Sequence, residues 1–172
     1  MNDPQEMNRQ ALRDASVALD TAEAAGEPAL LSQALALVAR CHRRMGAVAE
    51  GVWYAERGLQ LARSLSAVDA SVDALCELGE MAVQLSERLD DADDSRAVHR
   101  LRDAARDRGF EAARLALRSA DPQWEITVLL RVSDLFDSLG DHDDAIALQC
   151  RAVELMSGAA RSGGRAAHRR AG

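Results

Sequence analysis

Four aspartates lie within the five residues from Asp90 to Asp94. Their carboxylate oxygens are the kind of ligand that calcium prefers. A calcium loop of the EF-hand type needs ligands at alternating positions, a glycine at the sixth position and a glutamate at the twelfth. Counted from Asp90, those positions hold Ser95 and Leu101, so the pattern fails. We interpret the stretch as a turn and the acidic first turn of a helix, which the helix dipole favours. The same interpretation applies to residues 141–144.

The adjacent pair Cys41 and His42 offers a thiol and an imidazole, the groups of a cysteine nucleophile and its base. Neighbours on a helix point about 100° apart and do not face each other, which argues against a nucleophile–base pair. His42 is instead expected to be a packed or partly buried histidine. The three cysteines, which include Cys76 and Cys150, are widely spaced and odd in number, which favours reduced thiols. Zinc-ligand spacings and glycine-rich phosphate loops are missing from the sequence. We therefore expect no enzyme activity, no metal and no cofactor.

The composition favours helix along the whole chain of 172 residues. Alanine and leucine dominate, aromatic residues make up 3%, and the β-branched and aromatic runs that form strands are missing. All 21 basic residues are arginine, which we attribute to the codon bias of a GC-rich bacterial genome. Trp53 and Trp124 are expected to be packing residues.

The net charge of −7 is unevenly distributed. Every acidic residue precedes residue 160, and four arginines follow it. The acidic part before residue 160 disfavours a nucleic-acid partner, which requires a clustered basic face. No apolar run approaches the roughly 20 residues of a membrane span, and residues 1–10 lack the order of a signal peptide. These features predict a cytoplasmic protein without a nucleic-acid or membrane partner.

Helix caps and breakers divide the chain into about seven helical segments. Asp3-Pro4 and Asp121-Pro122 are typical helix starts, and Gly26 and Gly140 are typical stops. Residues 1–158 are expected to form one helical domain, and the Gly, Ala and Arg-rich residues 159–172 a disordered tail. Gly109 is a candidate break in the fifth helix. The expected helices span residues 4–25, 28–45, 48–65, 68–89, 94–119, 121–140 and 141–158.

The most regular pattern lies between Leu129 and Leu155. Gly140 and Asp141 form a stop and a new N-cap between two amphipathic helices. Ser133 and Ala145 are both small, so the two helices can approach closely. The first helical face consists of Leu129, Val132, Ser133 and Phe136, and the second of Ala145, Leu148, Ala152 and Leu155.

This pattern resembles the tetratricopeptide repeat (TPR), W-x₂-L-G-x₂-Y followed by A-x₃-F. Gln149 stands in place of the second aromatic residue and Ser157 in place of the usual proline. Looser copies begin at Leu35 and Leu75. The resemblance implies an all-α solenoid of antiparallel helix pairs, a TPR-like right-handed superhelix that binds a protein or peptide and performs no catalysis.

The run from Cys76 to Gln149 also looks like the helical-repeat region that precedes the cyclase domain of some bacterial diguanylate cyclases. The catalytic GG[DE]EF signature of those enzymes is absent from the chain. The alternative function is therefore a sensory fragment of a signalling protein whose catalytic domain lies elsewhere. A small enzyme with a pocket between helices is a third, less favoured class.

The TPR resemblance implies that the first helix of each pair lines a concave groove. The groove would be basic at its first repeat and acidic beyond it, so a bound segment should place acidic residues first and basic residues last. Asp73 and Glu77 would repel a C-terminal carboxylate. A second copy of the chain is another candidate partner. The expected groove residues are Gln33, Arg40, Arg43, Arg44, Asp73, Glu80, Gln84, Thr127, Asp134 and Asp137.

Overall fold

The computed structural model describes residues 3–90 and 94–169, and it describes side chains for residues 3–89 and 94–158. These ranges contain seven α-helices and no strand, which confirms the all-α prediction. The helices are α1 (Pro4–Ala25), α2 (Pro28–Arg44), α3 (Val48–Ser64), α4 (Val68–Asp90), α5 (Ser95–Ala116), α6 (Pro122–Leu139) and α7 (His142–Arg169).

The helix ends follow from capping residues in the sequence. The Asp3 carboxylate accepts a hydrogen bond from the Gln5 amide at 3.0 Å, and Asp121 caps α6 in the same way. Gly26 and Gly140 adopt φ angles of 66° and 81°, the left-handed conformation that ends a helix and that glycine adopts without strain. Local chemistry therefore sets these boundaries within a residue or two of the predicted ones.

Gly109 does not break α5, which runs continuously from Ser95 to Ala116. A Cβ atom at residue 109 would lie 2.9 Å from Cε1 of Phe136 on α6. The glycine therefore allows α5 to approach the Phe136 ring, and the expected break is replaced by a close helix contact.

Two further predictions concern the segment around Asp90 and the C-terminal end. Asp94 caps α5 through a 3.1 Å hydrogen bond from the Ala97 amide, while residues 91–93 lie outside the described residues. The last helix continues to Arg169, past the end near Gly158 that the sequence predicts. The added residues are rich in alanine and arginine, which have high helix propensity.

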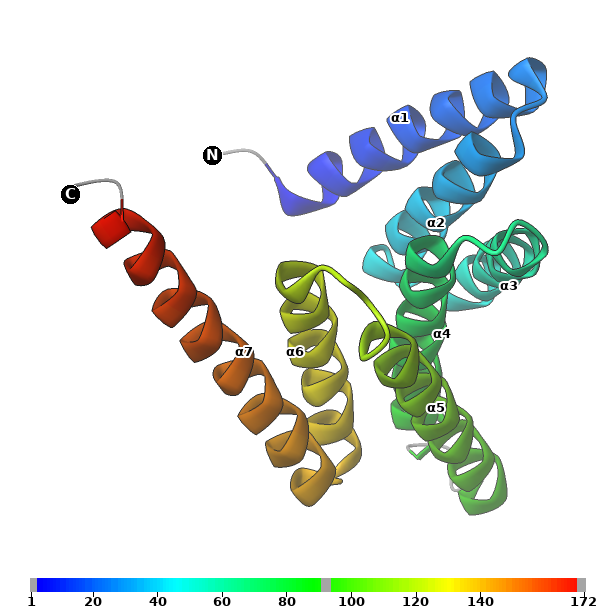
Figure 1. The fold of residues 1–172 in the computed structure, drawn as a ribbon. Helices are drawn as coiled ribbons and strands as arrows, with labels where there is room; N and C mark the ends of the chain where they lie inside the picture. Colours follow the sequence, from blue (N-terminus) through cyan, green and yellow to red (C-terminus); the bar gives the residue numbers. More distant parts are fainter. Residues whose placement is uncertain (1–2, 91–93, 170–172) are drawn as a thin grey trace.

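Each helix packs against the next one along the chain, and α4 also contacts α2 and α6. Figure 1 shows α4 in the middle of the molecule, with α5 and α6 beside it. Leu75, Leu78 and Met81 of α4 are fully buried and belong to the same hydrophobic core as Phe136 of α6. The first helices of three successive pairs, α2, α4 and α6, are thereby held next to one another.

Within the part of the chain that the structure describes, α1 packs closely against α2 alone, with one added 3.4 Å ion pair from Glu23 to Arg57 of α3, and α7 packs against α6 alone. Large apolar side chains are exposed on both, including Val17 on α1 and Ile146 and Val153 on α7.

Among the described residues, no helix combines the length and apolar character needed to span a membrane.

Candidate functional site

Glu77 on α4 is a fully buried carboxylate that three arginines surround. Its Oε1 atom lies 2.8 Å from Nε of Arg40, and its Oε2 atom lies 2.8 Å from Nε of Arg43. Both arginines come from α2. Nη2 of Arg131, from α6, lies 2.5 Å from Oε1. One side chain therefore joins three helices that are distant in sequence.

Glu80 and Asp73 extend this cluster along the same face of α4, because they lie three residues after and four residues before Glu77. Glu80 accepts from Arg43 Nη2 and from Arg131 Nε, both at 2.6 Å. Asp73 lies 3.4 Å from Arg131 Nη1. We call these six residues, Arg40, Arg43, Asp73, Glu77, Glu80 and Arg131, the arginine–carboxylate network.

The charges of this network balance, with three cations against three anions. Burial alone would raise the pKa of Glu77, but hydrogen bonds and charge from Arg43, helped by Arg131 and Arg40, hold the pKa below its ordinary value. Burial would also lower the pKa of Arg131, yet its bond to Glu80 raises that pKa overall. Glu77 and Arg131 are therefore both ionised at neutral pH, and each stabilises the charged form of the other.

The thiols near this cluster are poorly suited to nucleophilic chemistry. Burial raises the pKa of Cys76 to about 12, and it also raises the pKa of Cys41. Both are therefore protonated at neutral pH, and the thiolate is the reactive form. The described residues contain no group of three or more His, Cys, Asp or Glu side chains placed to hold a metal ion.

The His42 side chain packs against an aromatic ring, as the sequence predicts. Its ring stacks on Tyr54 of α3 with 5.3 Å between ring centroids. Trp124 is partly buried against the core. Trp53, however, is 55% exposed, so its predicted packing role is wrong. Its ring meets the Tyr54 ring edge-on, and the Arg57 guanidinium lies over it, 5.6 Å from the ring centroid.

A depression of about 410 Å³ opens beside the network, between α4 and α6. Glu87 and Asp134 line it with exposed carboxylates that form no ion pair within the part of the chain that the structure describes. Gln84 and Ser138 add neutral hydrogen-bonding groups. The full lining consists of Arg43, Glu80, Val83, Gln84, Glu87, Arg131, Asp134, Leu135 and Ser138.

The structure brings six of the ten expected groove residues to this region. Arg40, Arg43, Asp73 and Glu80 belong to the network, and Gln84 and Asp134 line the depression beside it. The arginines of α2 therefore pair directly with carboxylates of α4. The expected separation into a basic end and an acidic end does not occur, because these long side chains reach across the helix boundary.

The other four expected residues lie apart from the depression. Gln33 is exposed near the start of α2. Arg44 lines a separate depression together with residues of α1. The Thr127 hydroxyl donates to the backbone carbonyl of Gln123 at 3.0 Å, and Asp137 lies 3.0 Å from Nδ1 of His142.

Sequence reasoning missed the roles of Glu77 and Arg131. Glu77 was expected to repel a bound carboxylate, but three arginines neutralise its charge. Arg131 was not expected in the groove at all. Both interrupt strongly apolar helix stretches, Ala74-Leu75-Cys76 before Glu77 and Leu129-Leu130 before Arg131. A single charge within an apolar stretch was the available signal, because a buried charge needs a partner.

No protein-family model and no curated protein sequence matches the chain. One similar solved structure is described as "DHF58 filament"; it is 20% identical, with a TM-score of 0.46, covering 94% of this chain and 84% of that chain. Similarity at this level carries no argument about function.

Proposed function

We propose that the chain is a non-catalytic interaction module that binds a protein or peptide partner across the face formed by α2, α4 and α6. A TPR-like solenoid of helix pairs, coiled into a right-handed superhelix, would present such a face as an extended concave surface. The observation that carries the proposal is the depression between α4 and α6, with its exposed Glu87 and Asp134 carboxylates.

The arginine–carboxylate network supports this role because it joins the three helices beneath the surface. Glu77 bonds to Arg40 and Arg43 of α2 and to Arg131 of α6. A surface whose helices are fixed in advance loses less conformational freedom when a partner binds. The network thus acts as a scaffold for the depression. Its charges pair with one another within the protein.

The chemistry of the depression favours a basic partner segment. Arg43 and Arg131 are neutralised by Glu77 and Glu80, whereas Glu87 and Asp134 keep uncompensated negative charge. A lysine or arginine of the partner would therefore lie over α4 and α6, with apolar contact to Val83. Of the three arginines expected to attract acidic residues, only Arg44 remains outside the network.

We place this module in the bacterial cytoplasm. The support is the arginine-only set of basic residues and the odd, widely spaced cysteines, which suit a reducing compartment.

A library of phage-displayed random peptides tests the proposal. Peptides selected on the wild-type chain should be rich in lysine and arginine, and should bind much more weakly to a Glu87→Arg, Asp134→Arg double variant. The matched control is Asp20→Arg with Asp107→Arg, which reverses two exposed carboxylates on α1 and α5. Selected peptides that bind both double variants as tightly as the wild type would contradict the proposed binding face.

A further inference from the structure

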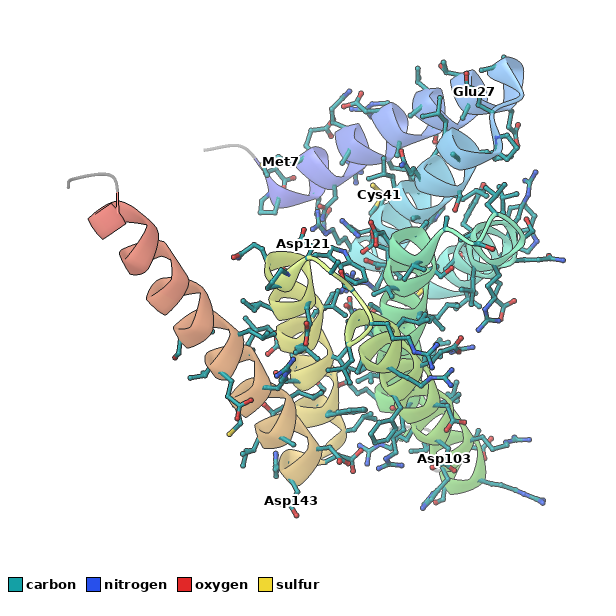
Figure 2. All side chains as sticks on the ribbon, in the orientation of Figure 1. Met7, Glu27, Cys41, Asp103, Asp121 and Asp143 are labelled. Atoms are coloured by element: carbon teal, nitrogen blue, oxygen red, sulfur yellow. The ribbon has the colours of Figure 1, made fainter. Side chains whose placement is uncertain are left out.

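A second depression, of about 450 Å³, opens between α3 and α5. Each of these helices packs against α4, but within the described residues they do not pack against one another. The depression is the space left between them, with α4 beneath it. In Figure 2, Asp103 marks the first half of α5, and the depression begins at Arg108, more than a turn further along that helix.

Two helix faces with charged side chains form the walls of this depression. On α3, Glu56, Gln60 and Arg63 are spaced by four and three residues and share one face. On α5, Arg108 and Glu111 are spaced by three residues and do the same. The two walls meet at one end, where Nη2 of Arg63 lies 2.7 and 2.9 Å from the two carboxylate oxygens of Glu111. This ion pair neutralises both charges at that end.

Arg108 is a partly buried cation without a carboxylate partner. Its Nη1 atom donates to the backbone carbonyl of Leu78 at 3.2 Å, and it forms no ion pair within the part of the chain that the structure describes. Burial lowers the pKa of Arg108, and the negative charge of Glu56 offsets only part of that effect. A guanidinium presents several N–H donors in one plane, so the bond to Leu78 leaves others for a ligand.

Glu56 supplies an unpaired charge of the opposite sign. Its side chain is exposed and forms neither an ion pair nor a hydrogen bond among residues 3–89 and 94–158. It is nevertheless near enough for its charge to act on Arg108. A ligand with one anionic and one cationic group would satisfy both side chains, whereas Glu56 would repel a simple anion and Arg108 a simple cation.

The floor of the depression is apolar, because it consists of Leu59 of α3 and of Leu75 and Leu78 of α4. Pockets for small molecules commonly combine such an apolar surface with a few polar groups that fix the orientation of the ligand. Their volumes run from about 300 to 1,000 Å³, and this depression lies towards the lower end of that range. Its shape and lining therefore suit a small ligand with a short apolar part.

We propose that the depression between α3 and α5 binds a free α-amino acid with an aliphatic side chain. The carboxylate of the ligand would pair with Arg108 and its ammonium group with Glu56, while its side chain would lie against the leucine floor. The bound amino acid would join α3 to α5 beside the Arg63–Glu111 ion pair. The site shares no lining residue with the depression between α4 and α6, so it does not depend on the proposed peptide-binding function.

Isothermal titration calorimetry of the full chain with L-leucine tests this proposal. L-Leucine should bind saturably, with a dissociation constant in the millimolar range or below. Isocaproate lacks the ammonium group of leucine, isoamylamine lacks its carboxylate, and glycine lacks its side chain. Each should bind at least about tenfold more weakly, because one of the three contacts is lost. Absence of saturable binding of L-leucine, or equally tight binding of any of these analogues, would overturn the proposal.

Substitutions of the two charged residues locate the binding to this depression. Arg108→Gln and Glu56→Gln should each weaken L-leucine binding by about tenfold. Glu56→Gln should also strengthen isocaproate binding, because the carboxylate that repels it is removed; a purely structural role of Glu56 would not produce this exchange. Since Glu56 is exposed, Glu56→Gln should keep the fold even if Arg108→Gln does not, as circular dichroism would show.

The matched controls are Glu50→Gln and Arg114→Gln, which remove the same charges at exposed positions of α3 and α5 outside the depression. Both should bind L-leucine as the wild type does. Binding of L-leucine that is unchanged in Glu56→Gln, or that falls equally in the control variants, would overturn the assignment of the site.

Discussion

The Glu77 carboxylate and the Arg131 guanidinium meet at 2.5 Å across the boundary between α4 and α6, and Glu77 is completely buried. Burying a carboxylate is costly unless it is paired and hydrogen-bonded. Arg40 and Arg43 complete that pairing from α2. The relationship explains how three helices that are not consecutive in the chain keep a fixed arrangement.

Removal of the Glu77 carboxylate should destabilise the fold strongly. Glu77→Ala leaves Arg40, Arg43 and Arg131 without their shared counter-ion, and breaking a buried pair in this way costs about 3–5 kcal/mol. The free energy of unfolding from urea titration measures the loss. The control is Asp107→Ala at an exposed position of α5, which should change stability by less than about 0.5 kcal/mol. Equal, small effects of both substitutions would contradict the structural role of the network.

The same carboxylate should make stability sensitive to acid. Burial opposes ionisation, but Arg43, Arg131 and Arg40 hold the folded-state pKa of Glu77 below 4.5. Since that pKa is lower in the folded than in the unfolded state, its contribution is complete above the unfolded value and is lost as pH falls through the folded value. Urea midpoints measured between neutral pH and pH about 3 should therefore fall less steeply for Glu77→Gln than for the wild type. Parallel curves of urea midpoint against pH for the two proteins would show that Glu77 does not cause the loss of stability in acid.

Gly109→Ala should destabilise the protein although alanine is the better helix former. The new methyl group would lie 2.9 Å from the Phe136 ring and 3.2 Å from Leu135, and overpacking of this kind costs about 1–3 kcal/mol. Gly158→Ala is the matched control, because nothing lies within 4 Å of a Cβ at that helical position. Thermal melting should show a lower Tm for the first variant and an equal or higher Tm for the second. A stabilised Gly109→Ala variant would mean that α5 and α6 are not in close contact there.

The three thiols should differ widely in their rate of alkylation. Cys150 is exposed, whereas burial raises the pKa of Cys41 and raises that of Cys76 to about 12. Iodoacetamide at mildly alkaline pH should modify Cys150 first and Cys76 last, with peptide mass spectrometry as the readout. Addition of urea should equalise the rates. Rapid modification of Cys76 in the folded chain would show that the core around α4 is open.

The helices were predictable because local residues determine them. Asp3, Asp121, Gly26 and Gly140 act through their own backbone neighbours, so a cap or a stop can be located from sequence. Gly109 shows where this reasoning ends. A glycine that breaks a helix and a glycine that admits the Phe136 ring look the same until the packing partner is known.

The candidate site was predictable as a surface but not as a set of interactions. Helical spacing placed Arg40, Arg43, Asp73 and Glu80 towards a common face, and the structure brings them together. Which charges neutralise which depends on contacts 34 to 58 residues apart in sequence. Spacing along one helix holds no information about such contacts, which is why Arg131 was overlooked.

The most direct test of the proposed binding face is a map of amide chemical shifts, measured by NMR on titration with a lysine- or arginine-rich peptide selected on the wild-type chain. The largest shifts should cluster at Gln84 and Glu87 of α4 and at Asp134 and Ser138 of α6. The Glu87→Arg, Asp134→Arg variant should show no saturable change. Shifts confined to α3, α5 or α7, with α4 and α6 unaffected, would contradict the proposed binding face.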